Sequence, residues 1–200
     1  MTTDQWLDAY RFHEAEWSGY EQLYDEFDWQ IPDRFNIAAY TTERWHGSDR
    51  LALVAADEEG SDRRYTFADL DRAANKLARG LVADGIERGD RVAVTGRQHP
   101  TVAIAHLAVW KCGAVTVPVS PLLGTAGLTY RLQDSGATAA VLGSSLLDTL
   151  NDIGLPSLPL ESVYAVDGES CLDCSRALQP LLEEEPPSFA TVDTAADEPA

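Results

Sequence analysis

The chain has 200 residues, of which 44% are hydrophobic and 24% charged, and this is the composition of a globular domain or a large part of one. Its 33 Asp and Glu residues outnumber 15 Lys and Arg residues, giving a formal net charge of -18. Phosphate binding needs clustered cations, so this charge argues against nucleic acid and anionic membranes as partners.

The N-terminal stretch predicts short helices that cover a neighbouring surface. Apolar and aromatic residues recur at a spacing of three and four between residues 3 and 45. Examples are Tyr20, Leu23, Tyr24 and Phe27. Asp4 and Ser18 are placed as N-caps. We expect this stripe to serve core packing, which is a commoner role for such a pattern than an aromatic cage around a cofactor.

A β-hairpin and a long helix follow. The apolar run LALVAA (51–56) and the run RRYTF (63–67) flank a glycine-containing turn, which predicts the hairpin. Thr66 and Asp69 form a capping box, which predicts that a helix begins directly afterwards. That helix is expected to end at Gly85, because glycine is favoured just beyond a helix C-terminus.

From residue 91 the sequence alternates between predicted strands and predicted helices. The expected strands are 91–96, 114–119, 138–143 and 162–168, and the expected helices are 100–113, 125–136 and 144–150. Gly143, Ser144 and Ser145 are interpreted as a strand end followed by a helix N-cap. This alternation predicts an α/β fold with a parallel sheet covered on both faces and with ligands beyond the carboxyl ends of its strands. The strand at 162–168 is expected to close the series.

The last segment predicts a short helix and then an irregular stretch. Residues 171–185 have the pattern of a candidate helix, whereas residues 186–200 lack periodicity and are rich in Pro, Asp, Glu and Thr. We therefore expect a helical leader at 1–48, an α/β subdomain at 49–182 and an acidic, proline-containing linker or tail at 183–200.

The candidate chemical motifs are sparse. The sequence contains neither of the two common glycine-rich phosphate motifs. Cys171 and Cys174 form a single C-x-x-C, which would suit a redox site at a helix N-terminus but is too few ligands for zinc. His99 and His106 lie seven residues apart and so share one helix face, yet packed or solvent-facing histidines are the commoner outcome. His13 and His46 are far away in sequence. From these motifs we predict no catalytic, cofactor-binding or metal-binding residue.

The acidic composition and the scarcity of lysine suggest a halophilic source. Lys76 and Lys111 are the only lysines. Salt at 1 M screens charges over about 3 Å, and this removes the self-repulsion of an acidic surface. The sequence has no signal-peptide pattern and no apolar run of roughly 18 residues, so we expect a cytoplasmic protein.

Three stretches together resemble the N-terminal part of the AMP-forming acyl-CoA synthetases, the adenylate-forming ligases. They are YTFADLDRAANKLARGLVADGIERGDRVAV (65–94), HLAVWKCGAVTVPVSPLLGTAGLTYRLQDSGATAAVL (106–142) and DEPA (197–200). The resemblance covers about residues 36–200, and the leader looks like that of acetyl- and medium-chain acyl-CoA synthetases. The chain departs from the family pattern at Gly127, where the family usually has an acidic residue.

The resemblance implies an enzyme that uses ATP and Mg²⁺ to convert a carboxylic acid to an acyl-adenylate, and then transfers the acyl group to CoA. In the family, the DEPA-like segment is followed by the ATP loop Tyr-Thr-Ser-Gly-Thr-Thr-Gly, which these 200 residues do not include. Lys76 and Lys111 match no catalytic lysine of the family. We therefore expect an incomplete domain, namely a fragment or split half of a ligase that is inactive alone and whose partner is the missing C-terminal portion.

Two alternatives stay open at this point. The chain could be a non-catalytic interaction module that pairs with a full-length relative through an unfinished sheet edge or an exposed apolar face. It could also be a redox protein that acts through Cys171 and Cys174, which would require a lowered thiol pKa. The acid that a complete enzyme would use is not indicated by these residues.

Overall fold

The structure is a computed structural model that describes residues 14–28, 31–45, 47–56, 60, 62–96, 98–166 and 175–200. The chain separates into two compact units, residues 1–34 and residues 35–200. The first unit is shorter than the predicted leader, because α3 (Ile37–Thr41) and the 3-10 turn η2 (Glu43–Trp45) pack against helices of the second unit.

The described part of the first unit contains the short helix α2 (Tyr20–Glu26). Its N-cap is Gly19, so the prediction of Ser18 as the cap is wrong, and the Ser18 N–H instead donates to Gln22 Oε1 at 2.8 Å. Tyr20 and Tyr24 are 75% and 71% exposed. Within the described part of the first unit, α2 therefore has no buried residue, and Asp4 lies outside the described residues.

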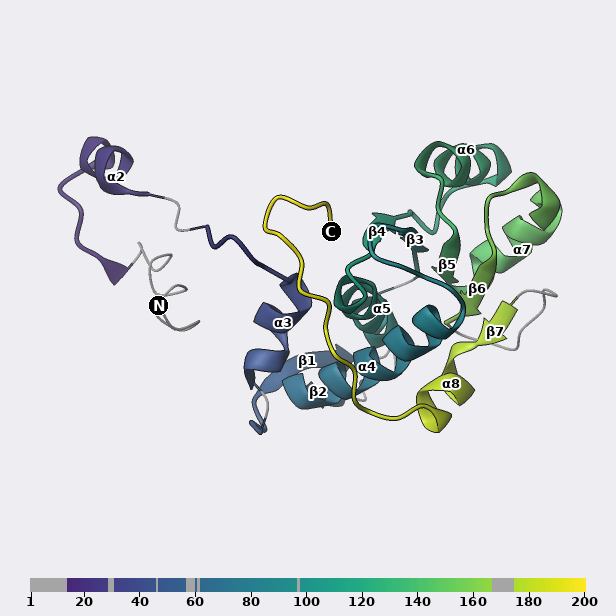
Figure 1. Cartoon of the computed structure of the whole chain (residues 1–200), viewed down its shortest axis with the longest axis horizontal. Helices are drawn as coiled ribbons and strands as arrows, with labels where there is room; N and C mark the ends of the chain where they lie inside the picture. Colours follow the sequence, from purple (N-terminus) through teal and green to yellow (C-terminus); the bar gives the residue numbers. More distant parts are fainter. Residues whose placement is uncertain are drawn as a thin grey trace. The chain divides into compact units, whose positions relative to one another are not determined.

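The second unit is built on a parallel sheet, as the alternating pattern predicted (Figure 1). Its strands are β3 (Arg91–Val94), β4 (Val115–Pro118), β5 (Ala139–Leu142), β6 (Ser162–Ala165) and β7 (Ser175–Ala177), in the order β4-β3-β5-β6-β7. The helices between them are α5 (Pro100–Lys111), α6 (Thr125–Ser135) and α7 (Ser144–Ile153). Gly143 is the N-cap of α7, so the serines after it are already helical. None of the helices in the described ranges is long and apolar enough to cross a membrane.

Both faces of the sheet are covered, because side chains alternate along each strand. Val92 and Val94 point into one buried cluster with residues of α4 (Phe67–Ala83) and α5. Ala93 points the other way, into a second cluster with residues of α6 and α7. The sheet thus lies between two helical layers, as predicted.

The predicted hairpin and the helix after it are confirmed. Strands β1 (Leu51–Ala56) and β2 (Asp62–Thr66) pair antiparallel. At the start of α4, Asp69 N–H donates to Thr66 Oγ1 at 3.1 Å and Thr66 N–H donates to Asp69 Oδ2 at 2.9 Å. A cap of this kind stabilises a helix by about 1 kcal/mol. Gly85 follows the helix with a φ of 95°, a left-handed conformation that favours glycine.

The sheet does not close at β6, so the prediction that residues 162–168 end the series is wrong. Strand β7 extends the sheet in parallel beside β6, and helix α8 (Leu178–Glu184) starts only after it. The ion pair between Arg176 Nη2 and Asp84 Oδ1, at 2.7 Å, ties β7 to the end of α4. A strand of three residues is too short to show periodicity, and its position depends on a residue far away in sequence.

The segment from 186 to 200, which we name the C-terminal strap, packs along the second unit. Val192 N–H donates to the Lys111 carbonyl at 2.8 Å, and Phe35 N–H donates to the Thr194 carbonyl at 2.9 Å. Figure 1 shows the strap running past α4 and α3. Composition alone indicated a linker or tail here, but these backbone hydrogen bonds give the strap a defined path.

Candidate functional site

The strand order places a topological switch point between β3 and β5. From β3 the chain passes to β4 on one side and then returns to β5 on the other, and ligands in such sheets gather beyond the carboxyl ends of the strands at this point. Thr95 follows β3 and its N–H donates to the Val141 carbonyl at 3.0 Å. Its buried hydroxyl has no hydrogen-bond partner among the described residues.

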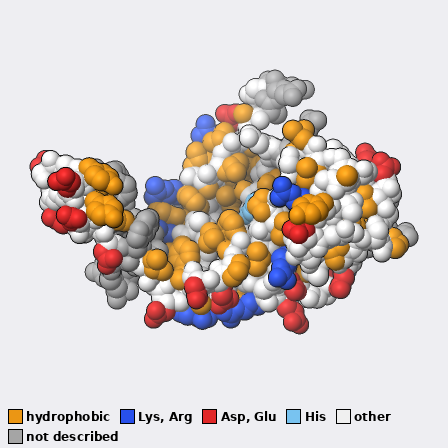
Figure 2. All heavy atoms as spheres, turned by 90° about the horizontal axis from the view of Figure 1, so that it is seen from above, with side chains coloured by type: hydrophobic (Ala, Val, Ile, Leu, Met, Phe, Trp, Pro, Cys, Tyr) orange, Lys and Arg blue, Asp and Glu red, His pale blue; other side chains and the backbone are white. Residues whose placement is uncertain are grey.

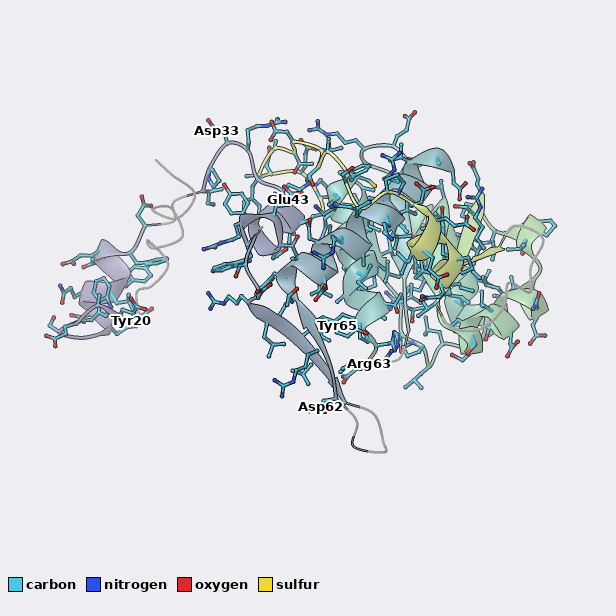
Figure 3. The ribbon with its side chains drawn as sticks, turned by 90° about the horizontal axis from the view of Figure 1, so that it is seen from below. Tyr20, Asp33, Glu43, Asp62, Arg63 and Tyr65 are labelled. Atoms are coloured by element: carbon cyan, nitrogen blue, oxygen red, sulfur yellow. The ribbon has the colours of Figure 1, made fainter. Side chains whose placement is uncertain are left out.

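A groove of about 650 Å³ lies beside the start of α5, a few residues after the end of β3. One wall consists of residues 98–100 and the first turns of α5, and the other of β1 and Arg63 from β2. Figure 2 shows hydrophobic side chains gathered on this face with histidine atoms beside them, and Figure 3 shows Arg63 on the hairpin close to Asp62. The lining is mostly apolar. Among the described residues that line the groove, Arg63 is the one with a positively charged side chain.

The two histidines singled out from the sequence both line this groove, which confirms that they share a helix face. His99 is the N-cap of α5, where its Nδ1 accepts from Thr101 N–H at 3.3 Å. The ring of His106 lies 5.5 Å from that of Trp110, and burial lowers the pKa of His106 below its ordinary value. The burial therefore favours the uncharged form of this ring. No group of three or more His, Cys, Asp or Glu in the described ranges could hold a metal ion.

Both lysines hold helices in place. Lys76 Nζ donates to the Leu182 carbonyl at 2.5 Å. Lys111 is fully buried, and its Nζ lies 2.5 Å from Glu43 Oε1 and 2.9 Å from Asp71 Oδ1. Its third proton points to Thr191 Oγ1 at 3.2 Å. We name Glu43, Asp71, Lys111 and Thr191 the Lys111 cluster.

The buried carboxylate of Asp71 in the Lys111 cluster is well supplied with donors. Besides Lys111, Asp71 accepts from the Thr42 hydroxyl at 3.0 Å and from Asn75 Nδ2 at 3.1 Å. A buried charge is tolerated only when it is paired and hydrogen-bonded in this way. The sequence carried one signal of this cluster that our interpretation missed, namely a single lysine in the mainly apolar helix predicted at 100–113.

The cysteine in the described part of the chain is not an activated thiol. Cys112 is buried, its Sγ–H donates to the Ala78 carbonyl at 3.6 Å, and burial raises the pKa of its thiol to about 12. A thiol protonated at neutral pH is a poor nucleophile. The C-x-x-C candidates Cys171 and Cys174 lie outside the described residues, as do His13 and His46.

Comparison with known proteins places this architecture in a family. A family model for AMP-binding enzymes matches residues 41–200. The chain is 27% identical over 189 residues to the mitochondrial acyl-coenzyme A synthetase ACSM3 of Mus musculus, which covers 90% of this chain and 32% of the relative. It is also 36% identical over 130 residues to the nonribosomal peptide synthetase NPS2 of Ceriporiopsis subvermispora (strain B), which covers 63% of this chain and 5% of the relative.

Solved structures share the fold. The acyl-CoA synthetase of Brucella canis superposes with a TM-score of 0.77 at 21% identity, over 87% of this chain and 33% of its own. The anthranilate CoA ligase AuaEII in complex with anthranoyl-AMP superposes with a TM-score of 0.71 at 21% identity, over 82% of this chain and 31% of its own. The chain thus spans about a third of the length of these ligases. Because the family model matches residues 41–200, the chain belongs to the AMP-binding enzyme family, the adenylate-forming ligases.

Proposed function

We propose that the chain is the N-terminal subdomain of an acyl-CoA synthetase, which activates a carboxylic acid as its adenylate and passes the acyl group to CoA in the cytoplasm. The observation that carries this proposal is the 189-residue match to an acyl-coenzyme A synthetase, since it covers 90% of the chain. The match to a nonribosomal peptide synthetase covers only 63%. The wider coverage favours a CoA ligase over a peptide synthetase.

The described residues do not fit ATP and Mg²⁺ by themselves. A triphosphate needs cations and backbone donors around it. Lys111 is buried in its cluster, Lys76 is bound to a carbonyl, and Arg63 is a single cation in the lining of the groove among the described residues. The sequence also has no glycine-rich phosphate motif. We therefore propose that ATP, Mg²⁺ and CoA are held by residues beyond these 200, and that this chain supplies the sheet and its covering helices.

Co-expression tests the proposal. The gene is sequenced past the codon for Ala200, and any reading frame that matches the remainder of the family is expressed together with this chain. We expect acid-dependent exchange between ATP and pyrophosphate from the pair but from neither piece alone. A full-length relative serves as the positive control. A co-purifying, folded pair without exchange on a broad panel of acids would count against the proposed reaction.

A second candidate function is a free-standing interaction module, and the hairpin favours it. Leu51 and Val54 on β1 are 47% and 45% exposed, although both are large apolar residues. In the described part of the chain β1 and β2 pair only with each other. Two-stranded hairpins are marginally stable, and their open edges invite a further strand. A monomer in sedimentation experiments that binds no apolar dye would exclude this function.

A further inference from the structure

The C-terminal strap is joined to the buried charge of the Lys111 cluster by one side chain. Thr191 belongs to the strap, whereas Glu43, Asp71 and Lys111 belong to η2, α4 and α5. Figure 3 shows Glu43 on the side of the molecule along which the strap runs. We propose that Thr191 and Lys111 form a clamp that docks the strap, and that Thr191 is a positioning residue for the chain that the strap carries.

The three protons of Lys111 Nζ each have an acceptor in the Lys111 cluster. An ammonium group has three protons to donate and no acceptor. Two of them go to the carboxylates of Glu43 and Asp71 at 2.5 and 2.9 Å, and the third goes to Thr191 Oγ1 at 3.2 Å. The hydroxyl of Thr191 in turn donates to Glu43 Oε1. Thr191 therefore closes a ring of hydrogen bonds among a cation, an anion and the strap.

Lys111 is completely shielded from solvent. Its side chain is 0% exposed, so water cannot replace a lost partner without a change in packing. A buried donor left without an acceptor is costly, and more so when it is charged. The hydroxyl of Thr191 thus couples the docked strap to the charge on Lys111. A side chain of the same shape without a hydroxyl would fill the same space but could not make this hydrogen bond.

The backbone beside Thr191 shows what the clamp positions. Val192 N–H donates to the carbonyl of Lys111 itself at 2.8 Å, and Asn36 Nδ2 donates to the carbonyls of Val192 at 3.0 Å and Trp110 at 2.6 Å. The side chain and the backbone of Lys111 therefore hydrogen-bond to neighbouring residues of the strap, Thr191 and Val192. If the proposed function holds, the strap leads from this subdomain toward the rest of the ligase, and the clamp fixes where that passage begins.

Hydrogen exchange on the chain itself tests the clamp, independently of any ligase activity. Two variants separate the hydroxyl from the shape of the side chain: Thr191→Val keeps the shape and loses the hydroxyl, while Thr191→Ser keeps the hydroxyl. The reporter is the Val192 N–H, and the reference is the Thr138 N–H, which donates to the Arg91 carbonyl in the sheet at 3.0 Å. We expect Thr191→Val to speed exchange at Val192 by at least roughly tenfold, with Thr138 unchanged and Thr191→Ser close to wild type.

Three results would overturn the clamp. Unchanged exchange at Val192 in Thr191→Val would mean that the hydroxyl does not hold the strap. Equal acceleration in Thr191→Ser and Thr191→Val would mean that the hydroxyl is not enough to dock the strap, because Thr191→Ser keeps it. Equal acceleration at Val192 and Thr138 would mean that the strap opens only when the whole unit unfolds. A failed ATP–pyrophosphate exchange assay would bear on the proposed function and leave this measurement intact.

Discussion

Replacing Lys111 with methionine should destabilise the fold severely, because it leaves a buried carboxylate without its cation. The side chains of Lys111 and Asp71 are 0% and 2% exposed, so neither charge is solvated once its partner is removed. Removing one member of a buried ion pair costs about 3–5 kcal/mol, a large share of the roughly 5–15 kcal/mol that stabilises a domain. We expect Lys111→Met to lower the free energy of unfolding by about 3–5 kcal/mol.

Arg72→Met is the matched control. Arg72 and Asp69 form an ion pair at 2.5 Å, the same separation as Lys111 and Glu43, but their side chains are 56% and 40% exposed. Exposed pairs contribute about 0–1 kcal/mol, so this variant should lose little. Urea unfolding at fixed salt, followed by circular dichroism, gives both values. Similar losses in the two variants would refute the reasoning that burial decides the cost.

A double variant shows which charge causes the loss. Lys111→Met with Asp71→Asn removes the uncompensated anion and keeps the shape of its side chain, while Glu43 is 28% exposed and can be partly solvated. We expect the double variant to be more stable than Lys111→Met by at least about 1 kcal/mol. It also provides a folded comparison if Lys111→Met alone does not fold. A double variant no more stable than the single one would mean that lost packing of the lysine stem, and not the stranded charge, dominates.

Three further predictions concern pH, backbone conformation and salt. Burial lowers the folded-state pKa of His106, so as the pH falls the unfolded chain takes up a proton on this ring before the folded chain does. The free energy of unfolding should therefore fall as the pH drops below about 6.5, and it should fall more in wild type than in His106→Phe. Parallel pH profiles of the two proteins would contradict this. Gly113→Ala should lower the free energy of unfolding by about 1–2 kcal/mol, because alanine is strained at the φ of 69° that Gly113 adopts. A further loss should come from Val192, whose Cγ1 would lie 2.9 Å from the new Cβ. Gly136→Ala is its control, since Gly136 has a φ of 63° and open space around it, and equal losses would rule out the contact. Raising NaCl from about 0.1 to 1 M should stabilise the chain of net charge -18, because the screening length shortens from about 10 to 3 Å; a lower unfolding midpoint in high salt would reject the halophilic hypothesis.

Local pattern was enough to predict most of the fold. The hairpin, the capping box at Thr66 and the strands β3, β4, β5 and β6 follow from periodicity, apolar runs and glycine positions that lie within a few residues of one another. The helix predicted at 125–136 ends at Gly136, which adopts a left-handed conformation as the C-cap of α6. These features depend on neighbours in sequence, and sequence reasoning finds such features well.

The features that were missed depend on distant partners. Thr191 and Glu43 are separated by 148 positions, and neither residue type indicates burial by itself. Strand β7 is too short for a pattern, and its ion pair joins Arg176 to Asp84, a residue far away in sequence. In the candidate site, the sequence predicted that His99 and His106 share a helix face but not that Arg63 of the hairpin would lie 3.5 Å from the His99 ring.

The most direct test of the proposed function is the exchange of labelled pyrophosphate into ATP by the purified chain alone, with a panel of carboxylic acids and with a full-length acyl-CoA synthetase as the positive control. If these 200 residues supply a scaffold, and the residues that hold ATP and Mg²⁺ lie elsewhere, exchange will stay at background with every acid. Acid-dependent exchange above background by the folded chain would contradict this, because it would place a working adenylation site within these residues.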